Sequence, residues 1–188
     1  MHEAIGRHED LLRARLRAVA ALALVSLILL AVRPVDGAQG EHTWSLLVEY
    51  SGLFASSDDE TGHGGGLGAE YRYALNDFVA VGAIARYGVL TGAGSDPRHL
   101  LSLSATAVYT IDALAWVPWL GLGVGLYGLV PGDSPLDGGA ALGVGLDYRR
   151  HRRFAVGAEV WLHALFNRFD DLPAVITAGL RLSWIHNR

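Results

Sequence analysis

The chain of 188 residues carries 15 basic and 19 acidic residues, a formal net charge of -4, and no cysteine. The missing cysteine excludes a disulfide framework and a thiolate metal site, and the mild negative charge is not that of a nucleic-acid-binding protein. Hydrophobic residues make up 51% of the chain, and the 24 glycines follow no triplet repeat, which excludes disorder and a collagen-like fold.

Residues 1–40 have the pattern of an export signal. An uncharged apolar run over residues 18–32 follows three arginines, Arg13, Arg15 and Arg17. A basic region, an apolar run and small residues beyond it are the parts of a secretory signal peptide. The spacing of small residues predicts cleavage after Gly40 or Gly37. The run is shorter than the ~20 residues of a spanning helix, so an uncleaved anchor is the less favoured alternative.

From residue 41 onward, apolar side chains recur at every second position, which is the period of a β-strand. Eight such runs follow one another in chain order: 44–50, 67–73, 79–87, 101–109, 116–126, 142–148, 154–162 and 176–184. Their apolar positions include no charged or amide side chain. The positions between them hold glycine, serine, threonine and a few charged residues. Each run therefore has one bulky apolar face and one small, polar face.

The composition of the small, polar face decides which face is inside. A soluble barrel would expose it to water, yet a soluble surface is normally about a quarter to a third charged residues. In the fifth run this face is instead Gly121, Gly123 and Gly125. The narrow interior of an eight-stranded transmembrane barrel needs such small residues, and its outer band must be apolar. We therefore expect the leucines to face lipid; a soluble, lipocalin-like carrier is the competing interpretation.

The links between the runs alternate in length. Short links at 75–77, 111–114 and 149–153 alternate with longer ones at 56–65, 91–98, 131–137 and 167–173. Outer-membrane barrels have short periplasmic turns and longer external loops. Aromatic residues prefer the membrane interface, and seven are expected to form a girdle at the periplasmic ends of the strands: Trp44, Tyr73, Tyr109, Trp116, Tyr148, Phe154 and Trp184.

The strand–turn–strand pattern "GLGAEYRYALNDFVAVGAIARYG" (66–88) and the closing "AGLRLSW" (178–184) resemble the OmpA/OmpX-like superfamily of eight-stranded outer-membrane barrels. The resemblance covers residues 42–186. It implies an all-β, antiparallel up-and-down transmembrane barrel over residues 41–188, located in the outer membrane of a Gram-negative cell. It further implies a monomer without cofactor, whose partners are outer-membrane lipid, lipopolysaccharide and the barrel-assembly machinery.

Seven charged residues fall on the inward face: Glu49, Glu70, Arg72, Arg86, Asp147, Glu159 and Arg181. Buried charges must be paired and hydrogen-bonded, so we predict an ion-pair network in the lumen. The charges of the second and third runs should lie together, and Arg181 should lie near Glu49 or Glu159. A network that fills the lumen implies a role in envelope integrity or surface interaction. Exchanging pairs would instead provide a narrow path for ions or small solutes.

A lipid A-modifying enzyme is a third alternative, because enzymes occur on such barrels. It would need a nucleophile and a base within hydrogen-bond reach. His99 is close in sequence to Ser102 and Ser104, but strand parity places it on the opposite face. We therefore expect no catalytic site. The acidic external links have no EF-hand spacing, so we also expect no metal site.

Overall fold

The computed structural model describes residues 39–54, 62–92, 96–111, 115–130, 136–151, 153–166 and 174–186; the side chains at 150 and 151 are outside this description. The expected signal peptide, residues 1–40, lies outside the described residues except for its last two. Its cleavage therefore stays a prediction.

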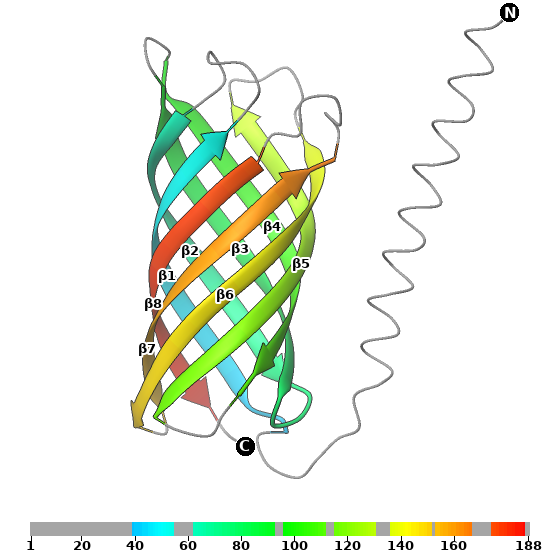
Figure 1. The fold of residues 1–188 in the computed structure, drawn as a ribbon, viewed down its shortest axis with the longest axis vertical. Helices are drawn as coiled ribbons and strands as arrows, with labels where there is room; N and C mark the ends of the chain where they lie inside the picture. The colour runs from blue at the N-terminus through cyan, green and yellow to red at the C-terminus, as the bar shows by residue number, and fades with distance from the viewer. Residues whose placement is uncertain are drawn as a thin grey trace, which may run out of the picture. The chain divides into compact units, whose positions relative to one another are not determined.

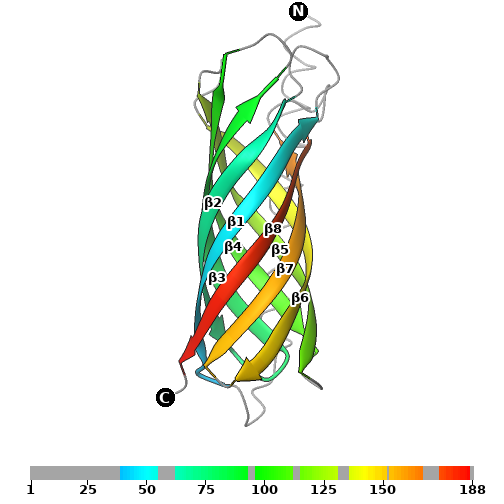
Figure 2. The same ribbon diagram turned by 90° about the vertical axis from the view of Figure 1, so that its left-hand side faces the viewer.

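Eight antiparallel strands form one closed barrel (Figures 1 and 2). In chain order they are β1 His42–Phe54, β2 Gly62–Ala74, β3 Val79–Thr91, β4 Arg98–Thr110, β5 Trp116–Val130, β6 Asp137–His151, β7 Phe154–Leu165 and β8 Ala174–His186. Each strand pairs with its neighbours in sequence, and β1 pairs with β8 to close the sheet. The predicted eight-stranded up-and-down barrel is confirmed.

The period of two in the sequence becomes an alternation between the outside and the inside of the barrel. In β1, Leu46 and Val48 are 58% and 65% exposed, whereas Leu47 between them is 1% exposed. The same alternation holds along the other strands, and the exposed set is the apolar set of the sequence. A continuous apolar band around the barrel far exceeds the few hundred Å² of a soluble surface patch. The band therefore faces lipid. Within the described ranges, no helix is long and apolar enough to cross a membrane.

The connections distinguish the two ends of the barrel. The turn end holds the short links between β2 and β3, β4 and β5, and β6 and β7, and the loop end holds the longer ones. In the β2–β3 turn, Oδ1 of Asn76 accepts hydrogen bonds from the backbone N–H groups of Phe78 and Val79, both at 2.8 Å. These hydrogen bonds from the Asn76 side chain stabilise the tight turn between the two strands. The predicted alternation of link lengths is therefore present.

Two link boundaries differ by more than one residue from those expected. β2 begins at Gly62, so the glycines that the sequence assigned to the end of the 56–65 link lie in the strand. A Cβ at Gly64 or Gly66 would collide with backbone oxygens of β3, so glycine is required there by the close approach of the two strands. At the turn end, β6 continues to His151, with a register shift after Tyr148, which shortens the 149–153 link.

The aromatic residues assigned to the girdle all lie on the outer face at the turn end. Five of them are exposed (Trp44, Tyr109, Trp116, Phe154 and Trp184), and Tyr73 and Tyr148 are half-buried. Neighbouring rings contact one another, as in the pair Trp116–Tyr148, whose ring centroids are 4.7 Å apart. Tyr71 and Phe78, which were not among the residues expected in the girdle, extend it through contacts with Trp44 and Tyr109.

Candidate functional site

The lumen is the candidate site because it gathers the charged residues of the strands. All seven predicted residues point inward and are at most 6% exposed. They come from β1, β2, β3, β6, β7 and β8: Glu49, Glu70, Arg72, Arg86, Asp147, Glu159 and Arg181. An inward position on any strand of so narrow a barrel brings a long side chain within reach of the opposite wall.

Arg86 connects three strands through the lumen. Its Nε atom donates to Oε1 of Glu49 on β1 at 2.7 Å, and its Nη2 atom donates to Oε1 of Glu159 on β7 at 3.1 Å. The charges of the second and third runs were expected to lie together. Within the described residues, Arg86 on β3 forms its ion pairs with β1 and β7. The reason is that closure of the barrel brings β7 opposite β3.

Arg181 is the second centre of the network. Its Nη1 atom donates to Oε2 of Glu159 at 3.3 Å and to Oε2 of Glu70 at 3.2 Å. Its Nε atom lies 3.1 Å from Oδ1 of Asp147. Of the two acids expected near Arg181, the ion pair is therefore with Glu159. The contacts to Glu70 and Asp147 were not expected from the sequence.

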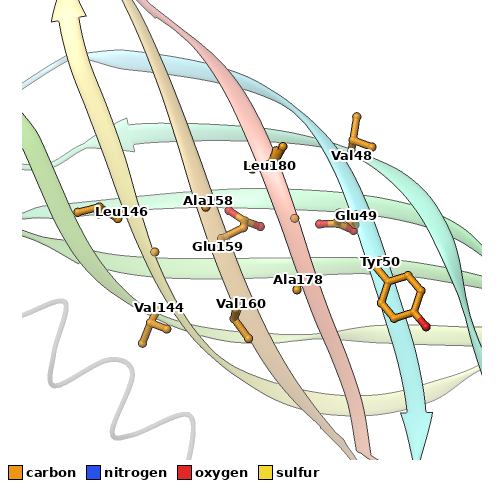
Figure 3. A pocket seen from close by; sticks show the side chains of 12 residues that line it. Val48, Glu49, Tyr50, Val144, Leu146, Ala158, Glu159, Val160, Ala178 and Leu180 are labelled. Carbon is orange, nitrogen blue, oxygen red and sulfur yellow. The ribbon is translucent and has the colours of Figure 1, made fainter.

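One further hydrogen bond and one glycine complete the arrangement. Nε of Arg72 donates to Oε1 of its strand neighbour Glu70 at 2.6 Å. In the register of the sheet, Gly179 of β8 is the partner of both Glu49 on β1 and Glu159 on β7. Figure 3 shows the two carboxylates on either side of β8. A side chain at Gly179 would meet Glu49, so the glycine makes room for the glutamate that lies beside it.

Two inward tryptophans pack against the arginines. The guanidinium groups of Arg72 and Arg181 lie 4.5 and 5.3 Å from the ring centroid of Trp119, and that of Arg86 lies 5.4 Å from Trp161. These are cation–π distances. Trp161 also donates its indole N–H to Oε1 of Glu159 at 3.0 Å. The aromatic faces thus cover cationic groups that the carboxylates hold in place.

The tryptophans explain three of the glycines of β5 and β6. A Cβ at Gly121 or Gly143 would overlap the ring of Trp161, and one at Gly145 would overlap Trp119. These glycines were expected to face inward, whereas Trp119 and Trp161 were not expected in the lumen. Strand parity was the signal, since both tryptophans alternate with outward leucines and valines.

An apolar layer closes the lumen at the loop end. Leu53, Leu90, Leu100 and Val175 are at most 5% exposed and pack together, with Leu129 against them. Beneath them lies a hydrogen-bonded chain. The Tyr127 hydroxyl is 2.9 Å from Nδ1 of His163, and Nε2 of His163 is 3.3 Å from Oγ1 of Thr177. The lumen is therefore packed at the loop end and at its centre.

The turn end is more open and polar. A cavity of about 40 Å³ is lined there by Thr43, Arg72, Asp147 and Arg181, among others. The Nη2 atom of Arg72 is buried without a hydrogen-bond partner in the protein. On the scale where a water needs roughly 10–15 Å³, the cavity has room for water that can accept from this nitrogen.

The arrangement of histidine and hydroxyl groups does not form an exposed nucleophile–base pair in the described residues. His99 faces outward, where its Nδ1 atom is 2.7 Å from the Tyr87 hydroxyl. Ser102 and Ser104 are buried in the lumen, as strand parity predicted. Among the described residues, no group of three or more His, Asp or Glu side chains is placed to hold a metal ion.

Comparison with known proteins identifies the fold. No protein-family model matches the chain, and no curated protein matches it. Among solved structures it is similar to Neisserial surface protein A, at 15% identity and a TM-score of 0.63 over 78% of this chain and 99% of that one. It is also similar to Ail, the attachment invasion locus protein of Yersinia pestis (19%, 0.52, 79% and 99%). A third similar structure is the outer membrane enzyme PagL (17%, 0.50, 73% and 97%). The chain thus has the fold of the eight-stranded outer-membrane barrels.

Proposed function

We propose that this chain is an exported, monomeric outer-membrane barrel with a closed interior, which contributes to envelope integrity or to surface interactions through its loops. Its outer band meets outer-membrane lipid and lipopolysaccharide, and the barrel-assembly machinery inserts it. The loop end then faces outward, because external loops are the longer ones in this class of barrel. The similar structures include a surface protein, an attachment protein and an enzyme, so the fold alone does not select the role.

The observation that carries the proposal is the closed lumen. The leucine layer and the network of Arg86 and Arg181 lie in series along the barrel. An ion would have to displace apolar side chains and then separate buried ion pairs, and each step is costly in a low-dielectric interior. This supports a structural or interaction role over the alternative of a narrow pore.

The same geometry argues against the enzymatic alternative. Both ring nitrogens of His163 lie within hydrogen-bond distance of a hydroxyl group, but the side chain is only 1% exposed beneath the leucine layer. A lipid substrate on the outside of the barrel has no access to it. The outward His99 is hydrogen-bonded to a tyrosine rather than to a serine.

Planar-bilayer recording tests the closed lumen. The purified, folded protein should give no steady current under an applied voltage. The double variant Leu53→Ala, Leu100→Ala removes part of the apolar layer and should also stay silent, because the ion pairs still block the lumen. A steady single-channel current through the wild type would contradict the proposal and favour the pore.

A further inference from the structure

The ion-pair network of the lumen contains one more carboxyl group than guanidinium groups. All of its members are at most 6% exposed. The carboxyl groups are those of Glu49, Glu70, Asp147 and Glu159, and the guanidinium groups are those of Arg72, Arg86 and Arg181. A buried charge without compensation is costly in a low-dielectric interior. The folded lumen therefore needs one more cation, or one of its acids must be neutral.

Three of the acids have the partners that an ionised carboxylate needs. Glu159 accepts hydrogen bonds from two guanidinium groups and from an indole N–H. Glu70 accepts from two guanidinium groups. Asp147 lies 3.1 Å from the guanidinium of Arg181 and lines the turn-end cavity, where water can solvate its charge. Cations and hydrogen-bond donors favour the charged form of a carboxyl group, so these three acids match the three arginines.

Glu49 is the acid with the fewest partners. Its Oε1 atom accepts from Nε of Arg86 at 2.7 Å, and the same guanidinium also donates to Glu159. The two acids lie on either side of β8 and share this one cation (Figure 3). The hydrogen bonds of the described residues include none to the Oε2 atom of Glu49. Glu49 is therefore the acid whose negative charge is in excess.

A small cavity lies beside Glu49, between the ion pairs and the leucine layer. It has a volume of about 10 Å³ and is lined by Glu49, Arg86, Tyr127, His163 and Thr177, among others. A water needs roughly 10–15 Å³ and two to four polar partners, so the cavity accommodates a single water at most. The guanidinium of Arg86 repels a metal cation from the same space. A metal ion is thus a poor candidate for the missing positive charge.

The other titratable groups near Glu49 do not supply this charge either. Tyr127 and His163 line the same cavity, and the ring nitrogens of His163 have hydroxyl partners rather than a carboxylate. A neutral imidazole satisfies both hydroxyl groups, since one nitrogen donates and the other accepts. Asp137 and Arg98 begin β6 and β4 at the loop end and do not line the cavity. The charged neighbours on β2, β3, β6, β7 and β8 are the other six members of the network.

We propose that Glu49 binds one proton in the folded barrel at neutral pH and is a neutral carboxylic acid. Its Oε1 atom accepts from Arg86, and its Oε2–H group donates to a water in the cavity. The rest of the network then has three carboxylates for three guanidinium groups. In the unfolded chain a glutamate loses its proton above about pH 4.3, so unfolding at neutral pH releases this proton. The stability of the barrel therefore falls as the pH rises, a link to the acidity of the surroundings that goes beyond the proposed function.

Urea titration in lipid vesicles at about pH 7 and about pH 8 tests the site, because ordinary histidines titrate lower, near pH 6.5. Release of one proton raises the unfolding equilibrium constant about tenfold per pH unit. We expect this rise for the wild type and a rise about tenfold smaller for Glu49→Gln, whose amide replaces the neutral acid. Glu159→Gln is the matched control. It removes an acceptor of three donors, so at about pH 7 its unfolding constant should exceed that of the wild type at least tenfold, whereas that of Glu49→Gln should not.

Infrared spectroscopy detects the proton directly. At about pH 7 the folded wild type should show the C=O band of a protonated carboxyl group, which Glu49→Gln and the unfolded wild type lack. The comparison with the unfolded wild type needs no variant, so the test does not depend on the folding of Glu49→Gln. A folded wild type without this band, or equal rises of the unfolding constant in wild type and Glu49→Gln, would overturn the inference. So would a loss of wild-type stability when choline chloride replaces sodium chloride, because sodium would then supply the missing charge.

Discussion

At the scale of single residues, the stability of the lumen depends on the ion-pair partners of each buried charge. Arg181 is 3% exposed and meets carboxylates from β2, β6 and β7. Removing one member of a buried ion pair leaves the remaining charge without compensation, which costs more than the pair itself contributes. The inward position of these residues follows from strand parity. Their partners do not, because an arginine side chain can reach several strands.

The variant Arg181→Met tests this dependence. It keeps much of the side-chain volume but leaves Asp147 without its ion pair and removes one cation from Glu70 and Glu159. We expect the free energy of unfolding in lipid vesicles, measured by urea titration, to fall by about 3–5 kcal/mol. Arg153→Met is the matched control, because Arg153 is an exposed arginine at the turn end, next to β7. Its effect should stay below about 1 kcal/mol. Equal losses in the two variants would contradict the network's role.

At the scale of the strand, alternation decides the environment of every side chain. Along β5, Leu120, Leu122 and Val124 are exposed, while Gly121 and Gly123 between them face inward, Gly121 against Trp161. This pattern was readable from the sequence because the period of a strand is a local property. The exact ends of the strands were less predictable. The glycines of β2 read as a loop, and only the approach of β3 shows that they are needed in the sheet.

The loss of stability caused by a charge on the outer face reports how deep that residue lies in the membrane. Leu122→Arg places a guanidinium near the middle of β5, where we expect a loss of about 2–4 kcal/mol in the free energy of unfolding. Val130→Arg adds the same charge at the loop end of β5, where the loss should be about 0–1 kcal/mol. Urea titration in vesicles of defined lipid provides both values. Two equal values would mean that the outer face of β5 does not cross a bilayer.

At the scale of the whole molecule, the barrel is apolar outside and polar inside, the reverse of a soluble protein. Closure between β1 and β8 removes the open edges of the sheet, which a strand in lipid requires because no water is present to satisfy its backbone. The core is therefore small, and the lipid supplies much of the environment that stabilises the fold.

Refolding tests this dependence on an apolar solvent. Protein diluted from urea into detergent micelles should give the heat-shifted gel band of a folded barrel. Protein diluted into plain buffer should give no such band and should aggregate, because the exposed leucines and valines have no apolar surroundings. A dispersed, folded protein in buffer alone would contradict the transmembrane assignment and restore the soluble-carrier interpretation.

The sequence alone determined the number of strands, their antiparallel order, the outward and inward sets and the alternation of link lengths, because these follow from local periodicity and chain connectivity. The tertiary structure decided which arginine meets which acid, how Trp119 and Trp161 occupy the space left by glycines, and where leucines close the lumen. These depend on barrel closure and stagger, which bring residues as distant as Arg86 and Glu159 within 3.1 Å.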